Sequence, residues 1–264
     1  MSTFTSGNIL SDRSRLLDKR KDCGYNNISA SCPEGPCGWG EQPWGPIFSG
    51  GKPLLEISVS FRKLVPEIPS TTHATFGLYR YPAKFIPQVI AYVLKNYAQS
   101  RSKVFDPFAG CGTVGVVARI YGCDYELWDL NPILEVVHAV AVQTPRELDI
   151  EALFRQMRGY SGEFVPRWSR LQYWYPEDFL PFLFKVWGFY HSLEDEYAKR
   201  LLSIPLLRVT RYFSYDDVQR QKLSQSPRSK QRIEVLLDSD WQAEFFRLLR
   251  VEVGKVIEVI PPKM

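Results

Sequence analysis

The chain has 264 residues, of which 45% are hydrophobic, 14% aromatic and 23% charged. This balance is typical of a globular protein with a core, and it excludes collagen, a simple coiled coil and an intrinsically disordered chain. A net charge of +4 is too small to indicate nucleic-acid binding by itself. The chain has no apolar run of membrane-helix length and no secretory signal, so we expect a soluble, cytoplasmic protein with no membrane partner.

Residues 1–52 are rich in Gly and Pro and show no sustained apolar period. Such clusters interrupt regular structure, so we predict an irregular N-terminal extension. The extension holds Cys23, Cys32 and Cys37, spaced C-x8-C-x4-C. Zinc sites usually show tighter Cys pairs and a fourth ligand. We therefore expect no bound metal and interpret these residues as free thiols of a reducing cytoplasm, with a role that stays open.

Strand-like and helix-like segments alternate from Pro53 onward. The predicted strands are 103–107 and 124–129, and the predicted helices are 87–98 and 113–121. Residues 54–61 are predicted as a strand or a short buried segment. The side chains expected on the buried face of the first helix are Val89, Ile90, Val93, Leu94 and Tyr97. The order strand, Gly-rich turn, helix, strand defines a βαβ unit. It predicts an α/β region with a parallel sheet within residues 53–135.

Beyond residue 135 the apolar pattern becomes mainly helical. Helical periodicity is found at 133–143, 147–159, 177–201 and 232–250. We predict a mainly helical insertion over 136–250, with a basic loop at 208–232. The last segment, 251–264, contains the β-branched run VEVGKVIEVI. We predict a strand-like tail there that returns to the sheet.

The Gly-rich turn of the βαβ unit suggests a cofactor site. Small residues let a ligand approach the backbone, and amides at the start of a helix favour polar or anionic groups. Gly110, Gly112 and Gly115 satisfy G-x-G-x-x-G, a pattern that alone suggests a nicotinamide or flavin dinucleotide. Asp129, at the end of the next strand, suits ribose hydroxyls. The glycines do not distinguish an NAD-type oxidoreductase from an enzyme with another nucleoside cofactor.

Asp106, directly before the turn, does distinguish them. A carboxylate beside a dinucleotide pyrophosphate is unfavourable because like charges repel in a partly desolvated site. S-adenosylmethionine carries an ammonium and a sulfonium and no phosphate, so Asp106 suits it better. The structural alternative is that Asp106 only caps the turn or the helix.

Three motifs in this region resemble those of DNA amino-methyltransferases, which methylate cytosine N4 or adenine N6. The segment DPFAGCGT at 106–113 is similar to their cofactor motif, YPAKF at 81–85 to the element that precedes it, and WDLNP at 128–132 to their second strand end. The resemblance covers about residues 71–135. It implies a partial Rossmann-like class I methyltransferase domain with a helical insertion, and S-adenosylmethionine as cofactor.

The resemblance also implies a set of cofactor-binding residues. Those expected to bind the methionine and adenosine parts are Asp106, Phe108, Gly110, Gly112 and Thr113, with Asp129 on the ribose and Tyr81, Pro82 and Lys84 shaping the methionine end. For Phe108 and Tyr81 the alternative is core packing, because aromatic side chains are usually at least partly buried. Lys84 has the alternative of a solvated surface position.

The basic stretch 208–232 is the candidate DNA contact. It interleaves cations with aromatic residues and Ser, and such residues contact phosphates and bases. The candidate nucleic-acid residues are Arg211, Tyr212, Arg220, Lys222, Arg228 and Lys230. The alternative is a solvated loop. A weaker resemblance of YFSY at 212–215 and KLS at 222–224 to an inserted region of the same family favours double-stranded DNA.

The family's catalytic motif, [DSN]-P-P-[YFW], is absent from the sequence. The single Pro-Pro pair, Pro261-Pro262, has neither the acceptor nor the aromatic residue. We therefore assign no catalytic residue and expect a fragment or one half of a split, site-specific restriction–modification enzyme, with cytosine N4 favoured over adenine N6. A second chain would then carry the motif, and the chain alone would show no turnover. The alternative is a non-catalytic subunit that holds cofactor or DNA for a partner.

Overall fold

The computed structural model describes residues 2–5, 60, 65–66, 68–80, 84–99, 101–167, 170–220 and 222–260. The chain divides into two compact units, 1–6 with 61–264, and 7–60. The first unit contains all the elements that follow. The cysteines Cys23, Cys32 and Cys37 and, apart from Ser60, the predicted strand or short buried segment 54–61 lie outside the described residues.

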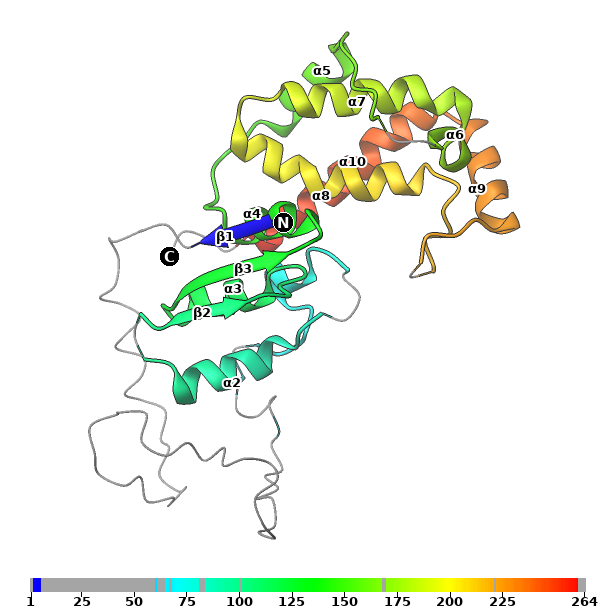
Figure 1. Cartoon of the computed structure of the whole chain (residues 1–264). Coiled ribbons are helices and arrows are strands. Elements are labelled where there is room, and N and C mark those ends of the chain that lie inside the picture. Colours follow the sequence, from blue (N-terminus) through cyan, green and yellow to red (C-terminus); the bar gives the residue numbers. More distant parts are fainter. Residues whose placement is uncertain are drawn as a thin grey trace, which may run out of the picture. The chain divides into compact units, whose positions relative to one another are not determined.

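A three-stranded mixed sheet forms the base of the α/β region (Figure 1). Strand β2 (Lys103–Asp106) runs parallel to β3 (Asp124–Asp129), as the βαβ pattern predicts. Strand β1 (Ser2–Thr5) pairs antiparallel with the other edge of β3, so that Ser2 lies opposite Asp129. The beginning of the predicted irregular extension is therefore a strand. Its four residues have no apolar alternation long enough to reveal it, and pairing with β3 stabilises it.

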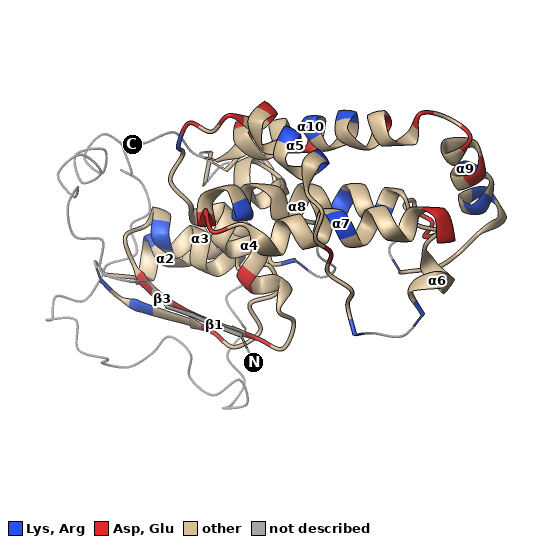
Figure 2. Ribbon diagram, turned by 90° about the horizontal axis from the view of Figure 1, so that it is seen from above, with Lys and Arg blue, Asp and Glu red and all other residues tan. Residues whose placement is uncertain are grey.

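Three helices cover one face of this sheet (Figure 2). Helix α3 (Thr113–Ile120) packs on β2 and β3, with α2 (Pro87–Tyr97) and α4 (Ile133–Val142) on either side of it. Tyr125 and Leu127 of β3 point into this layer and are buried. The buried face of α2 is rotated from the predicted one. Ile90, Ala91 and Leu94 are buried, whereas Val93 and Tyr97 are exposed.

A bundle of helices follows the α/β region (Figure 1). Its elements are α5 (Ile150–Gly159), α6 (Leu171–Trp174), the 3-10 turn η3 (Glu177–Phe179), α7 (Leu180–Ser192), α8 (Glu196–Tyr212), α9 (Pro227–Leu237) and α10 (Trp241–Val259). Phe179 is central to the core, since its ring stacks on Phe213 with centroids 5.0 Å apart and also contacts Trp241 and Phe245. Aromatic pairs of this kind add to the free energy gained by apolar burial.

The predicted strand-like tail is wrong, because residues 251–259 are the second half of α10. Phe245, Leu249, Val253 and Val256 are buried at helical spacing, and α10 packs along α8. The β-branched residues favour a strand locally, but burial of this helical stripe outweighs their propensity. The bounds of the basic loop are also wrong. Helix α8 continues to Tyr212 and α9 begins at Pro227, which leaves only 213–226 between them.

Arg208 connects the helical part to the α/β part. Its guanidinium forms an ion pair with Glu252 of α10 at 2.7 Å and donates to the carbonyl of Leu78, just after the 3-10 turn η2 (Ala74–Gly77). Helices α4 and α8 also pack together. Among the described helices, none is both long and apolar enough to span a bilayer.

Candidate cofactor site and basic surface

The turn between β2 and α3 has the backbone conformation that its glycines allow. Gly110 and Gly112 have φ of 57° and 78°, in the left-handed region where other residues are strained. Between them and β2, the Ala109 N–H donates to the carbonyl of Trp128 at 2.9 Å. The turn is thereby attached to the neighbouring strand, and its amides lie at the carboxyl end of the parallel pair.

Asp129 holds this end of the sheet together. Its two carboxylate oxygens accept the Gly110 N–H at 2.8 Å and the Asn131 N–H at 2.7 Å. Asn131 in turn accepts the Ile133 N–H at 3.1 Å, at the start of α4. Since each carboxylate oxygen has two acceptor positions, these bonds leave capacity for ligand hydroxyls.

Asp106 ends the adjacent strand and accepts the Phe108 N–H at 3.0 Å. It therefore caps the turn, as the structural alternative predicts, and it remains a carboxyl group at the strand end. Burial raises the pKa of Asp106, the Phe108 hydrogen bond opposes this, and the negative charge of Asp129 raises the pKa further. A cation between the two carboxylates would therefore be stabilised.

Two large apolar side chains flank the acids and are open to solvent. Phe108 and Leu130 are each 87% exposed. The core-packing alternative for Phe108 is therefore wrong, because the side chain projects away from the described core. An exposed aromatic ring and an exposed Leu beside polar groups offer a surface that a flat apolar ligand can cover.

Gly112 and Gly115 face protein rather than open space. A methyl group at Gly112 would lie 2.8 Å from Nδ1 of His138, and one at Gly115 would lie 2.6 Å from Cδ1 of Leu127. These two glycines permit close packing of α3 on β3 and α4. Both added methyl groups would also approach the ring of His138. It is fully buried and bonds the Tyr125 hydroxyl at 3.0 Å.

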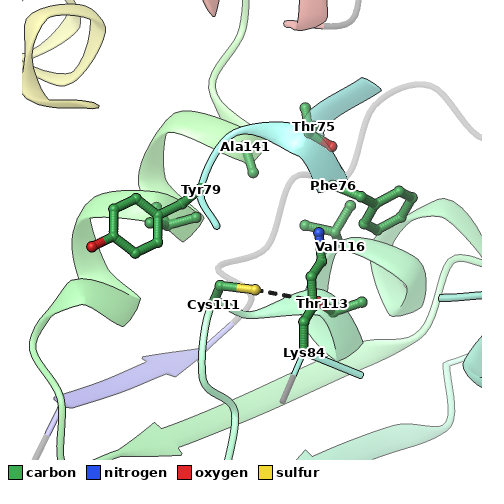
Figure 3. Close-up of a pocket in the computed structure, with 9 residues that line it drawn as sticks. Thr75, Phe76, Tyr79, Lys84, Cys111, Thr113, Val116 and Ala141 are labelled. Carbon is green, nitrogen blue, oxygen red and sulfur yellow. Dashed lines mark hydrogen bonds between the residues drawn. The ribbon is translucent and has the colours of Figure 1, made fainter. Parts of the chain in front are cut away.

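Lys84 and Thr113 lie together in a separate small cavity (Figure 3). Lys84 Nζ lies 5.6 Å from the centre of the Phe76 ring, and burial lowers the pKa of Lys84. Thr113 is buried, with its hydroxyl 3.5 Å from Cys111 Sγ. The cavity holds about 10 Å3, which admits one water molecule at most and no cofactor. Tyr81 and Pro82 lie outside the described residues.

The predicted nucleic-acid residues fall into two groups. Arg211 Nε donates to Asp216 at 2.6 Å, Arg220 pairs with Asp217 at 3.5 Å, and Tyr212 lies under the guanidinium of Arg232 at 4.9 Å. Lys222, Arg228 and Lys230 are exposed. Both α9 and α10 contain basic and acidic residues (Figure 2).

A groove of about 880 Å3 lies between the end of α8, α9 and the start of α10. Its lining includes Tyr212, Arg228, Gln231, Arg232, Val235 and Arg247. The sequence pattern did not predict this groove, because it depends on how the three helices pack. Among the described residues, no group of three or more His, Cys, Asp and Glu side chains has the arrangement of a metal site.

These features define a mixed α/β protein with a parallel strand pair, a glycine turn between two strand-end carboxylates, and a helical part with exposed cations at Lys222, Arg228 and Lys230. The chain is similar to the Type II methyltransferase M.MvaI of Kocuria varians, with 27% identity over 126 residues. The similarity covers 41% of this chain and 28% of that methyltransferase, so it supports a methyltransferase-like protein for this part only. No family model matches the chain, and no solved structure matches it.

Proposed function

We propose that this chain binds S-adenosylmethionine at the carboxyl ends of β2 and β3 and serves a site-specific DNA amino-methyltransferase. One observation carries the proposal. Asp106 and Asp129 end two paired parallel strands on either side of the glycine turn, and the charge of Asp129 raises the pKa of Asp106. Ligands of open α/β sheets bind at this end of the strands.

The charges favour this cofactor over a dinucleotide. Two carboxylates repel a pyrophosphate and attract an ammonium or a sulfonium. In the proposed arrangement Asp106 attracts the ammonium, Asp129 accepts the ribose hydroxyls, and the amides of the turn contact polar groups. Phe108 and Leu130 would cover the adenine, which would account for apolar side chains with 87% exposure. Lys84 and Thr113 would support the cofactor site without contacting the cofactor, since the separate cavity that they line is too small to hold it.

The second part of the proposal concerns DNA. Lys222, Arg228 and Lys230 are exposed and fit contacts with phosphates, with Arg220 beside them. Amino-methylation requires a base flipped out of the duplex and an acceptor for its exocyclic amine. The sequence contains no Pro-Pro-aromatic motif for that purpose. We therefore assign cofactor and DNA binding to this chain, as a fragment or one half of a split enzyme, and the catalytic motif to residues outside this sequence, within a restriction–modification system that favours cytosine N4.

The decisive experiment is a calorimetric titration of the purified chain with S-adenosylmethionine, with NAD as the control ligand. Saturable binding of the methyl donor alone is the expected result. Binding of NAD instead, or of neither ligand, contradicts the proposed cofactor. A second assay follows the transfer of labelled methyl groups to duplex DNA. The chain alone should give no product, and turnover by the pure chain would disprove the assignment of catalysis to residues outside this sequence.

A further inference from the structure

Asp216 is a buried acid within the basic stretch 208–232. Its side chain is 1% exposed and accepts the Arg211 Nε–H at 2.6 Å and the Ser224 N–H at 2.8 Å. Asp216 also forms an isolated β-bridge with Gln225. These contacts join the two ends of the loop 213–226 to each other, so both ends are held at the same place in the structure.

Arg232 closes the same loop from α9. It donates to the carbonyl of Ser214 at 2.7 Å and to that of Asp216 at 3.2 Å, while its guanidinium stacks on Tyr212 at 4.9 Å. A guanidinium has five N–H donors in a fixed fork. Arg211 and Arg232 direct these donors to partners within the protein, and such internal bonds would be lost if either side chain turned outward.

The N-terminus of α9 is hydrogen-bonded to the loop as well. Ser226 and Ser229 form a reciprocal capping box, and the Ser229 hydroxyl also donates to the carbonyl of Tyr215 at 2.6 Å. Arg228 and Lys230 lie in this first turn and are exposed, and Lys222 is exposed on the loop. The internal bonds therefore determine where three outward cations stand relative to one another.

We infer that Asp216 is a positioning residue for DNA. It holds Arg211 and the loop so that Lys222, Arg228 and Lys230 match the spacing of backbone phosphates. Arg211 then acts through Asp216 and does not contact a phosphate itself, which replaces the role that the sequence predicts for it. This inference rests on the proposed DNA binding.

The direction in which one substitution changes the DNA affinity distinguishes a positioning role of Asp216 from a simple effect of its charge. Asp216→Asn makes the chain more positive by one charge, and electrostatic attraction alone would then tighten DNA binding. Loss of the Arg211 bond instead releases the loop, and binding weakens. Glu234→Gln is the matched control, because Glu234 is exposed on α9 and its substitution changes the charge equally without touching the loop.

The experiment measures duplex-DNA affinity by fluorescence anisotropy over a range of salt concentrations. Asp216→Asn should weaken binding by about tenfold and flatten the salt dependence, as the loss of phosphate contacts requires. Glu234→Gln should bind as tightly as the wild type or more tightly. Arg228→Gln should lower the slope of log K against log salt by about 1. Unchanged titration with S-adenosylmethionine shows that the Asp216→Asn protein is folded.

A second variant keeps the test independent of folding. Arg211→Lys preserves the charge but replaces the Nε donor, so it should weaken DNA binding as Asp216→Asn does. A direct phosphate contact would instead tolerate Lys. If both variants bind DNA as the wild type does, the inference is wrong and the DNA proposal stands. If the wild type itself binds no duplex, the DNA proposal fails and the inference falls with it.

Discussion

The carboxylate of Asp129 accepts the backbone N–H of Gly110 at 2.8 Å, across 19 residues of sequence. A side chain at the end of β3 thereby fixes the turn that follows β2. The same carboxylate accepts the N–H of Asn131, which leads into α4. One acid thus joins both connections at the end of the sheet where the proposed ligand binds.

Asp129→Asn should weaken S-adenosylmethionine binding by about 10–100-fold, since hydrogen bonds to charged groups contribute about 1.5–3 kcal/mol. The amide keeps one acceptor oxygen, so one of the two backbone bonds is lost as well. Calorimetry on both proteins measures the change. Asp124→Asn, at the opposite end of β3, serves as the control and should bind as the wild type does. Equal affinities of all three proteins for S-adenosylmethionine would show that Asp129 does not contribute to cofactor binding.

Phe108→Ala should lower cofactor affinity by about tenfold while leaving stability within about 0.5 kcal/mol of the wild type. The side chain is 87% exposed, so its removal leaves no cavity in the protein. Thermal unfolding and calorimetric titration of the same preparation separate the two effects. Leu223→Ala, at a residue exposed on the basic loop, is the control for loss of apolar surface. A fall in the melting temperature without a change in affinity would contradict the proposed adenine contact.

The sequence predicted the βαβ unit well because its signals are local. The proline after Asp106, the glycines of the turn and the apolar run of α3 each determine their own neighbourhood. Strand β1 was missed because it is defined by its pairing with β3 rather than by its own residues. The tail at 251–259 was assigned to a strand from propensity alone, and its packing against α8 decides otherwise.

In the candidate site, too, local features could be predicted from the sequence and long-range contacts could not. Asp106 and Asp129 are placed at strand ends by the sequence pattern, and both lie there. The pattern did not show that Arg211 is bonded to Asp216, nor that Lys84 shares a small cavity with Thr113. Those arrangements depend on contacts between segments distant in the sequence. A count of basic residues could not separate the guanidinium groups that pair within the protein from the other exposed cations.

Gly112→Ala and Gly115→Ala should each destabilise the fold by about 1–3 kcal/mol, the usual cost of overpacking a core. The added methyl groups would meet the buried His138 ring and Leu127. Gly122→Ala is the matched control for Gly112→Ala, because φ is positive at both glycines (68° and 78°) but nothing lies within 4 Å of the atom added at Gly122. It should cost only about 1 kcal/mol of backbone strain. Chemical denaturation measures all three, and equal losses at Gly112 and Gly122 would show that strain rather than packing requires a glycine at 112.

His138 links the glycine turn to the pH dependence of folding. It is fully buried between α4, α3 and β3, where it contacts Tyr125 and lies beside Gly112. Burial lowers the pKa of His138 to about 4, and the positive charge of Arg119 lowers it as well, while a hydrogen bond with the Gly112 backbone opposes the shift. The folded protein therefore holds this imidazole neutral, whereas the unfolded chain protonates it near pH 6.5.

Because the unfolded state binds the extra proton, the stabilising contribution of neutral His138 is fully present above pH 6.5 and is lost as the pH falls toward 4. A difference of this size corresponds to about 3 kcal/mol in the free energy of unfolding. Urea denaturation between pH 7 and pH 4 should show that loss in the wild type and a much smaller slope in His138→Gln. His191→Gln is the control, because burial also lowers the pKa of His191 but that residue is far more exposed. Its slope should stay close to that of the wild type, and an unchanged slope in His138→Gln would mean that another group titrates.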